Sequence, residues 1–401
     1  MFESLRALPP DPILALTPAF RADPNPDKID LGAGVYKDEQ GNTPVMRAVK
    51  RAEERVLAGQ RSKAYVGPAG APGFNDAIAR LAFGDTLIGS LGERRVTLQT
   101  PGGCGGLRLA AEFLARANPD ATVWLSDPTW PNHGPLLGAA RLKIESYPYY
   151  DFDAHAVRFD AMLDCLSSAA AGDVVLLHGC CHNPCGGDLD PSQWRALRDL
   201  ALARGFTVLI DMAYQGLGDG IEADVAGVRL LAESLPELLL VTSCSKNFGL
   251  YRERTGALSV ICASSGVAKA AASQLAATAR ANWSMPPDHG AAVVQAIMED
   301  ADLRADWERE LGEVRGRINS LRADLVAALR GAGLARDFSF IEREKGMFSF
   351  LGVTPDQAET LIRKYSIYLV KSGRINIAGI NRTNINYLAN SLAELFKESE
   401  H

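Results

Sequence analysis

Short apolar runs alternate with longer segments of helical periodicity between about residues 95 and 262. The runs are VTLQT (96–100), ATVWLS (121–126), DVVLLHG (173–179), FTVLID (206–211), LLLVTS (238–243) and GALSVI (256–261). Most are continuously apolar, as expected of strands that are covered on both faces. Segments between them, such as 193–205, have helical periodicity and end at a glycine. The pattern predicts an α/β fold with a mainly parallel sheet between helices.

A different pattern follows towards the carboxyl terminus. Apolar residues recur every three or four positions over 302–331, which predicts one long amphipathic helix. They are Trp307, Leu311, Val314, Ile318, Leu321, Leu325 and Leu329. Beyond this helix, GMFSFLG (346–352) and GRINIAG (373–379) are predicted strands of a smaller α+β unit. We therefore expect an N-terminal arm (1–12), a small domain (13–45 plus 313–401) and a large domain (46–312).

Composition and charge narrow the classes of partner. The chain has 401 residues, 47% of them hydrophobic and 22% charged, and its formal net charge is −6. Nucleic acid and anionic membranes both need a basic footprint, and the sequence contains no long run of Lys or Arg. It also has no stretch of about 18 apolar residues that would cross a bilayer. The first residues lack the pattern of a signal peptide, so we expect a cytoplasmic protein.

The seven cysteines are scattered along the chain and odd in number. Cys180 and Cys181 are adjacent, so they would pair only through a strained ring. Free thiols in a reducing compartment are the expectation. The segment CCHNPC (180–185) lacks the second pair of ligands that zinc sites usually have. No metal is therefore expected.

Polar residues follow the predicted strands at the point where each strand ends. Because the carboxyl ends of parallel strands meet at one edge of a sheet, we expect these residues to lie together. They are Gly102, Gly103, Trp130, His133, Asn183, Asp211, Tyr214, Lys246 and Arg254. Each has an ordinary interpretation by itself, as a turn glycine, a core aromatic, a helix cap or a solvated lysine.

Taken together, these residues match the needs of pyridoxal 5'-phosphate. Its aldehyde requires a lysine for a Schiff base, and its ring nitrogen requires a carboxylate to stay protonated. Its phosphate favours hydroxyls, backbone N–H groups and an arginine. The glycine-rich turn after 96–100 is neither a Walker lysine loop nor the spaced dinucleotide fingerprint, which argues against a nicotinamide dehydrogenase.

Segments along nearly the whole chain resemble the aspartate/aromatic amino-acid aminotransferases, which are fold-type I pyridoxal-phosphate enzymes. They occur in order as LGAGVYKDE, SDPTWPNH, HGCCHNPCG, DMAYQG, SCSKNFGLYRERTG, RANWSMPPDHGA, DFSFI with GMFSF, and SGRINIAG. The likeness covers about residues 1–396. It implies a seven-stranded sheet in the large domain, pyridoxal 5'-phosphate as cofactor, and a homodimer with shared active sites.

The resemblance also implies a role for each matching residue at the cofactor. Lys246 would hold the cofactor and then move the substrate's proton, Asp211 would pair with the ring nitrogen, and Trp130 would stack on the ring. Tyr214 and Asn183 would bind the phenolic oxygen. The residues implied at the phosphate are Gly102, Gly103, Cys104, Ser243, Ser245, Arg254 and, from the neighbouring subunit, Tyr65. Those implied behind the ring are His133 and His178.

Substrate binding is implied for a further set. Arg374 would clamp the α-carboxylate with a bidentate fork, and Gly34, Trp130 and Asn183 would line the site. Arg280, contributed across the dimer, would bind a distal carboxylate. The small-molecule partners implied are amino acids and 2-oxo acids.

The chain departs from the family's pattern at several positions. Cys104 and Cys185 replace the usual Thr or Ser and Thr, and a thiol is a weaker donor. Trp283 and Met285 stand where aspartate-specific members often have Tyr and Asn, which makes the pocket near Arg280 more apolar. We therefore expect transfer from Tyr, Phe or aspartate to 2-oxoglutarate by a ping-pong mechanism.

Alternative functions stay open at this point. They are a strict aspartate aminotransferase and a β-lyase or decarboxylase of the same fold. Which bond breaks depends on which one stands perpendicular to the ring, and a sequence does not show that orientation. A binding module without turnover is disfavoured, because Lys246, Asp211 and Arg374 are all present.

Overall fold

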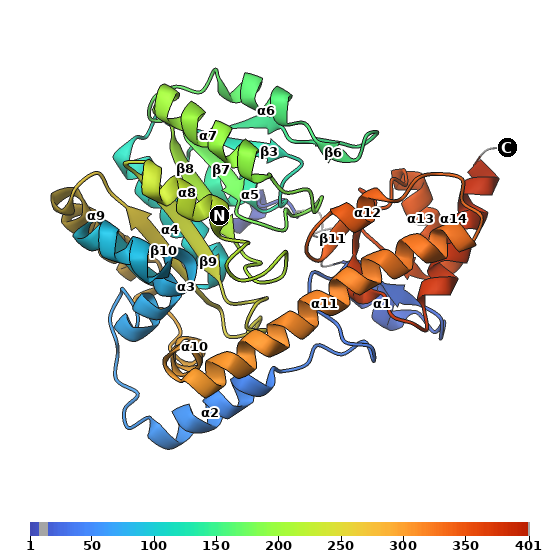
Figure 1. Cartoon of the computed structure of the whole chain (residues 1–401), viewed down its shortest axis with the longest axis horizontal. Coiled ribbons are helices and arrows are strands. Elements are labelled where there is room, and N and C mark those ends of the chain that lie inside the picture. Colours follow the sequence, from blue (N-terminus) through green and yellow to red (C-terminus); the bar gives the residue numbers. More distant parts are fainter. Residues whose placement is uncertain (8–14, 400–401) are drawn as a thin grey trace. The chain divides into compact units, whose positions relative to one another are not determined.

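The computed structural model describes residues 1–7 and 15–399 (Figure 1). Contacts divide the chain into two compact units. The smaller consists of Met1–Thr43 with Arg317–His401, and the larger is Pro44–Gly316. The expected N-terminal arm lies partly outside the described residues. Of its remaining part, Phe2–Ser4 form a short 3-10 helix, η1.

The larger unit is built on one seven-stranded sheet. In spatial order its strands are β2 (Arg95–Pro101), β10 (Thr255–Ile261), β9 (Leu238–Ser243), β8 (Thr207–Met212), β7 (Val174–His178), β3 (Thr122–Asp127) and β4 (Lys143–Pro148). Strand β10 runs antiparallel to both of its neighbours. All the other neighbouring pairs are parallel. The predicted α/β class and mainly parallel sheet are confirmed.

The larger unit also contains helices, several of which pack on this sheet. They are α2 (Arg47–Gly59), α3 (Pro72–Leu91), α4 (Gly102–Ala117), α5 (His133–Gly138), α6 (Phe159–Leu166), α7 (Pro191–Arg204), α8 (Ala226–Ser234), α9 (Ser265–Trp283) and α10 (His289–Glu299). A 3-10 turn, η2 (Gly92–Arg94), precedes β2, and a small hairpin joins β5 (Tyr150–Asp151) to β6 (Ala156–Val157). Leu107 and Leu114 of α4 pack with Val123, Val241 and Leu258 of the sheet in one buried cluster.

The helix predicted over 193–205 shows how local signals define an element. It is present as α7, and Asp190 caps its start by accepting hydrogen bonds from the N–H groups of Ser192 and Gln193. Gln193 completes the capping box. The helix ends at Gly205, whose φ of 75° lies in the left-handed region that glycine tolerates.

The smaller unit contains short two-stranded sheets and helices. Strand β1 (Ile29–Asp30) pairs in parallel with β12 (Ile367–Tyr368), and β11 (Phe348–Phe350) pairs antiparallel with β13 (Arg374–Asn376). The helices are α1 (Leu16–Ala22), α12 (Phe340–Arg343), α13 (Pro355–Tyr365) and α14 (Ile385–Ser399), with a 3-10 turn, η3 (Ile377–Gly379). The strands predicted over 346–352 and 373–379 are present in shorter form.

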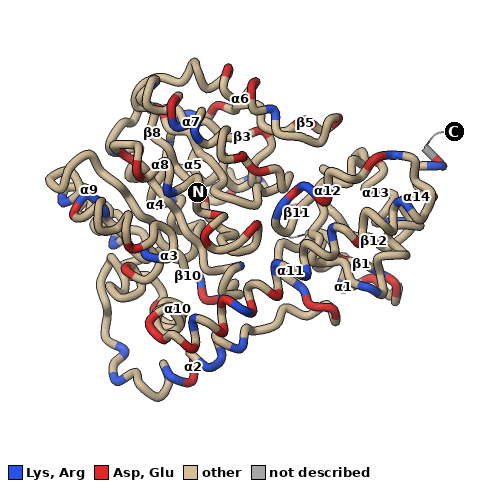
Figure 2. Tube along the Cα trace, viewed as in Figure 1, with Lys and Arg blue, Asp and Glu red and all other residues tan. Residues whose placement is uncertain are grey.

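The predicted long helix is present as α11 (Ala301–Gly331). Trp307, Leu311 and Ile318 of its apolar stripe are fully buried. Residues of both charge signs occur along α11 and along α2 (Figure 2). Arg51 of α2 pairs with Asp306 of α11 at 3.0 Å. Within residues 1–7 and 15–399, no helix combines the length and the apolar character of a membrane span.

Candidate active site

The strand ends of the large sheet gather the predicted residues along one edge. His178, at the end of β7, is the register partner of Asp211 in β8. Ser243, at the end of β9, is opposite Gly256 of β10. Because β10 runs antiparallel, its beginning and the preceding Arg254 lie at the same edge. These residues therefore lie together at the carboxyl ends of the parallel strands, where we expected them.

Asp211 lies at the centre of a chain of hydrogen bonds. Its Oδ2 is 3.1 Å from Nε2 of His133, which is fully buried. Nδ1 of His133 is 2.8 Å from Oγ1 of Thr129, and that hydroxyl is 3.1 Å from Nε2 of His178. Burial raises the pKa of Asp211. The hydrogen bond from His133 and the positive charges around the carboxylate outweigh this effect, so the pKa lies below its ordinary value.

The direction of these hydrogen bonds follows from the groups involved. An ionised carboxylate only accepts, so Nε2 of His133 carries a proton. With a neutral ring, Nδ1 of His133 then accepts from the Thr129 hydroxyl, and Thr129 in turn accepts from Nε2–H of His178. Burial lowers the pKa of His178 to about 3, so its ring is neutral. The chain of donors therefore points towards Asp211.

Lys246 follows β9 on a loop and is partly buried. Its Nζ lies 5.0 Å from the centre of the Tyr214 ring. Burial, followed by the charge of Arg254, lowers the pKa of Lys246, although Asp211 acts in the opposite direction. A primary amine with a lowered pKa is unprotonated more often at neutral pH, which is what a nucleophile or a base requires.

A cradle for an anion lies at the start of α4. No side chain caps this helix, and its first residue, Gly102, has a φ of 69°. A Cβ on Gly102 would lie 2.6 Å from Nη2 of Arg254, and one on Gly103 would lie 3.2 Å from Cβ of Ser243. Glycine therefore allows the backbone N–H groups, the guanidinium and the buried Ser243 and Ser245 to converge. This set of donors fits a phosphate.

Helix α4 begins inside the glycine-rich turn, at Gly102. Glycine disfavours helices in general, but here close packing against Arg254 and Ser243 excludes side chains. Cys104 lies on the exposed side, and its Sγ accepts from Nδ2 of Asn132 at 3.7 Å.

The remaining predicted residues of the larger unit differ in their surroundings. Trp130 meets the His133 ring edge-on, with ring centres 5.2 Å apart at 90°. Asn183 is 9% exposed, and its Oδ1 has no hydrogen-bond partner among the described residues. By contrast, Tyr65 is 89% exposed and Arg280, near the end of α9, is exposed. The fold of the larger unit places neither Tyr65 nor Arg280 at the strand edge that carries Asp211.

Arg374 and Gly34 belong to the smaller unit and come together there. Arg374, on β13, is 4% exposed, and its Nη2 donates to the carbonyl of Gly32 at 2.7 Å. Its guanidinium lies 4.4 Å from the centre of the Phe348 ring. A Cβ on Gly34 would lie 3.3 Å from Cζ of the same ring. A buried guanidinium held in this way has a fixed orientation, which suits recognition of a carboxylate.

The residue pattern matches a known family model over most of the chain. The family is aminotransferase class I and II, and the match covers residues 26–392. The chain belongs to this family.

Relatives of this aminotransferase carry two kinds of name. The aspartate aminotransferase of Escherichia coli (strain K12) is 47% identical over 385 residues, which are 96% of this chain and 97% of that one. The aromatic-amino-acid aminotransferase of Pseudomonas aeruginosa is 48% identical over 394 residues, 98% of either chain. The structure of the aromatic-amino-acid aminotransferase from Burkholderia pseudomallei, covalently bound to pyridoxal phosphate, has a TM-score of 0.95 at 43% identity and covers 98% of this chain and 99% of that one. Identity alone therefore does not choose between aspartate and aromatic substrates.

Thr129 was not predicted from the sequence of this aminotransferase. The residue lies between a cis proline peptide, Asp127–Pro128, and Trp130, where threonine is unremarkable. The one signal was its position four residues before His133. His182 was also overlooked. Its Nε2 is 3.0 Å from Oγ of Ser126, and its ring centre lies 4.0 Å from that of His178.

Proposed function

We propose that this aminotransferase moves the amino group of an aromatic amino acid or aspartate to 2-oxoglutarate by a ping-pong mechanism, with pyridoxal 5'-phosphate held by Lys246. The observation that carries the proposal is the meeting of Lys246 and Asp211 at one strand edge, beside the anion cradle of α4. An enzyme that acts on the α-carbon of amino acids needs that amine and that carboxylate together.

The described residues fit the cofactor at three places. The cradle at α4 would hold the phosphate through Gly102, Gly103, Cys104, Ser243, Ser245 and Arg254. Asp211 would face the ring nitrogen. The unpartnered Oδ1 of Asn183 marks an amide that is buried without its full set of partners, as expected beside a ligand. Asn183 and Tyr214 would bind the phenolic oxygen, and Trp130 would cover the ring.

When bound, the cofactor supplies an electron-accepting ring that stabilises negative charge at the substrate's α-carbon. The protein's own groups do the rest. Asp211 is ionised because its pKa is lowered by the His133 hydrogen bond against the effect of burial. It would therefore favour a proton on the ring nitrogen of the bound cofactor. Lys246 would take the proton from the α-carbon and deliver it to the cofactor carbon on the other side of the amino nitrogen, as a base with a lowered pKa.

Substrate carboxylates would be held by two arginines. Arg374 would bind the α-carboxylate, with Gly34 leaving room beside Phe348. Arg280 would bind the distal carboxylate of aspartate or glutamate in the neighbouring subunit of a homodimer, and Tyr65 would reach that subunit's phosphate. The exposure of Arg280 and Tyr65 in the single chain supports this assignment.

The domain boundaries and the location in the cell are part of the same proposal. We assign residues 46–312 to the large, cofactor-binding domain and 13–45 plus 313–401 to the small domain, with 1–12 as the arm. The division of contacts between Thr43 and Pro44 and between Gly316 and Arg317 supports nearby boundaries. All seven cysteines lie in the described residues and none of them forms a disulfide, which supports a reducing compartment such as the cytoplasm.

The substrate range is tested by Arg280→Ala. We expect kcat/KM for aspartate and glutamate to fall by about 10- to 100-fold, since a hydrogen-bonded charge contributes about 1.5–3 kcal/mol. The kcat/KM values for tyrosine and phenylalanine should change by less than about threefold, because these substrates carry no distal carboxylate. The measurement is kcat/KM for a panel of donors with 2-oxoglutarate, with Lys269→Ala on the same helix as the matched control.

Two outcomes of this panel would contradict the proposal. Wild-type activity on aspartate with inert aromatic donors would leave a strict aspartate aminotransferase. Failure of glutamate to convert the cofactor to its amine form in a half-reaction, with release of ammonia or carbon dioxide instead, would indicate a β-lyase or decarboxylase.

Thr129 is a positioning residue, and its substitution is expected to lower activity less than Arg280→Ala does. Thr129→Val removes the hydroxyl between His133 and His178 without changing the side-chain shape much. The loss of about 1 kcal/mol of hydrogen bonding should lower kcat by about fivefold while KM stays near its wild-type value. Nitrogen NMR of the imidazoles should show the His133 tautomer becoming mixed. Thr129→Ser should restore both kcat and the single tautomer, whereas an unchanged tautomer in Thr129→Val would contradict the proposed role.

A further inference from the structure

Two adjacent thiols follow β7 and take no part in the proposed reaction. Cys180 is 6% exposed and Cys181 is 1% exposed. The carboxylate of Asp224, which is 8% exposed, lies beside them. One ligand atom from each of these three residues lies within 4.8 Å of the other two. Two sulfurs and a carboxylate oxygen this close together form a set of donors that can share one ion.

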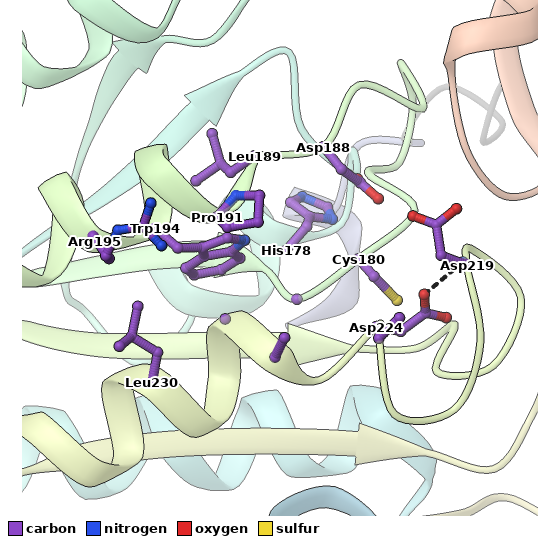
Figure 3. A pocket seen from close by; sticks show the side chains of 14 residues that line it. His178, Cys180, Asp188, Leu189, Pro191, Trp194, Arg195, Asp219, Asp224 and Leu230 are labelled. Carbon is purple, nitrogen blue, oxygen red and sulfur yellow. Dashed lines mark hydrogen bonds between the residues drawn. The ribbon is translucent and has the colours of Figure 1, made fainter.

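A cavity of about 450 Å³ is lined by Cys180 and Asp224. Figure 3 shows the sulfur of Cys180 directed towards Asp224 at this cavity. Two more carboxylates, those of Asp188 and Asp219, line it. Arg195 lines it as well but lies beyond Trp194, away from the carboxylates (Figure 3). The cavity therefore offers room for water ligands and an excess of negative charge for a cation.

The loop after β8 holds Asp224 in place before any ion binds. Asp224 Oδ2 accepts from the N–H groups of Gly216 and Gly218 at 2.8 and 3.0 Å. Asp224 Oδ1 accepts from those of Asp219 and Gly220 at 2.7 and 3.3 Å. These four hydrogen bonds together fix the orientation of the carboxylate. Carboxylate ligands of metals are commonly fixed by outer hydrogen bonds of this kind.

The turn after β7 fixes the thiols in a comparable way. Cys181 has a φ of 51°, in the left-handed region, and its N–H donates to Oδ2 of Asp188 at 2.7 Å. The N–H of His182 donates to Oδ1 of the same carboxylate at 2.9 Å. Adjacent side chains in an extended strand point to opposite faces, and the left-handed residue is what allows both thiols to approach one carboxylate.

We propose that Cys180, Cys181 and Asp224 bind one divalent thiophilic cation of the zinc and cadmium class, with water from the cavity as a further ligand. Both thiols would release their protons to solvent on binding, because thiolates are the ligands. Two thiolates, a carboxylate and water satisfy the four-coordinate preference of such ions. The spacing rule missed this site because it looks for a second cysteine or histidine pair, whereas the third ligand comes from a distant loop.

The site has a structural consequence that is separate from transamination. The ion would tie the turn after β7, which carries Asn183, to the loop after β8, which follows Asp211 and Tyr214. The binding test therefore does not depend on the proposed substrates. Ion binding without transamination would contradict only the proposed function. Transamination without ion binding would contradict only the metal site.

The test is a titration of the chelator-treated holoenzyme with cadmium ions, followed by sulfur-to-cadmium charge-transfer absorbance. We expect one cadmium ion per chain. Cys180→Ser and Cys181→Ser should each lower the absorbance to about half, and Asp224→Asn should weaken binding about tenfold or more while keeping the absorbance per bound ion. Cys165→Ser and Cys262→Ser are matched controls that should leave the titration unchanged.

A second measurement covers the case in which these variants do not fold. X-ray absorption of cadmium in the unaltered holoenzyme should give two sulfur neighbours together with oxygen neighbours. Absence of a charge-transfer band in the wild type would overturn the proposal. So would a band that persists in the Cys180→Ser/Cys181→Ser double variant, or a cadmium shell with a single sulfur.

Discussion

Lys246→Ala is expected to lower kcat/KM for every amino donor by at least about 10⁴-fold, the upper range for one positioned acid–base group. The variant loses both the amine that holds the cofactor and the base that moves the α-proton. Uniform loss across donors is expected because neither role depends on the substrate's side chain. The measurement is the donor panel with 2-oxoglutarate, together with borohydride treatment and peptide mass analysis. The wild type should retain the reduced cofactor on the peptide that contains Lys246.

Two controls separate the amine's chemistry from its charge and from folding. Lys246→Arg keeps a positive charge, but its guanidinium is never deprotonated in proteins and cannot replace the amine. It should be as inactive as Lys246→Ala. Lys269→Ala, on the exposed side of α9, should behave as the wild type. Reduced cofactor found on another lysine, or activity of Lys246→Ala within about tenfold of wild type, would be incompatible with the proposed role.

The apolar pattern predicted the buried strands well because burial on both faces leaves a clear signal. Strands β9 and β10 are buried at every position, and both were predicted within one residue of their observed ends. Strand β4 (Lys143–Pro148) was not among the predicted runs. It lies at the edge of the sheet, pairs with β3 alone, and exposes three of its six residues. In the sequence, the residue pattern of such an edge strand is not distinguishable from that of a loop.

The candidate site was predicted to the extent that single residues at strand ends define it. The order of apolar runs placed Asp211 and Lys246 at one edge by a general rule of parallel sheets. Thr129 and Asp224 lacked any such signal, since a hydroxyl in a turn and an acidic loop residue are common. Their roles depend on partners that are distant in the sequence, such as His178 for Thr129 and Cys181 for Asp224. Contacts of that kind become visible only in three dimensions.

Asp211→Asn should be the second most damaging change, with kcat lowered by about 10³-fold, the upper range for removing one preorganised electrostatic partner. Asparagine keeps the shape of aspartate but has no charge. The nitrogen that faces it would then lose its proton more easily, and charge at the α-carbon would be stabilised less. The introduced amide would also present either an oxygen or an N–H to His133, which removes the fixed direction of the Thr129 network. The measurement is kcat for aspartate and phenylalanine across pH.

The pH profile distinguishes this electrostatic role from a simple loss of packing. In the wild type the pKa of Asp211 lies below its ordinary value, because the His133 hydrogen bond and nearby positive charges outweigh the opposing effect of burial. The carboxylate is therefore charged throughout the neutral pH range, and its titration does not change kcat in that range. Its contribution is lost only as pH falls through that lowered pKa. Asp211→Glu retains the charge and should recover part of kcat, whereas Asp211→Asn should stay slow at every pH. Equal losses in the two variants would mean that the position matters for its shape rather than for its charge.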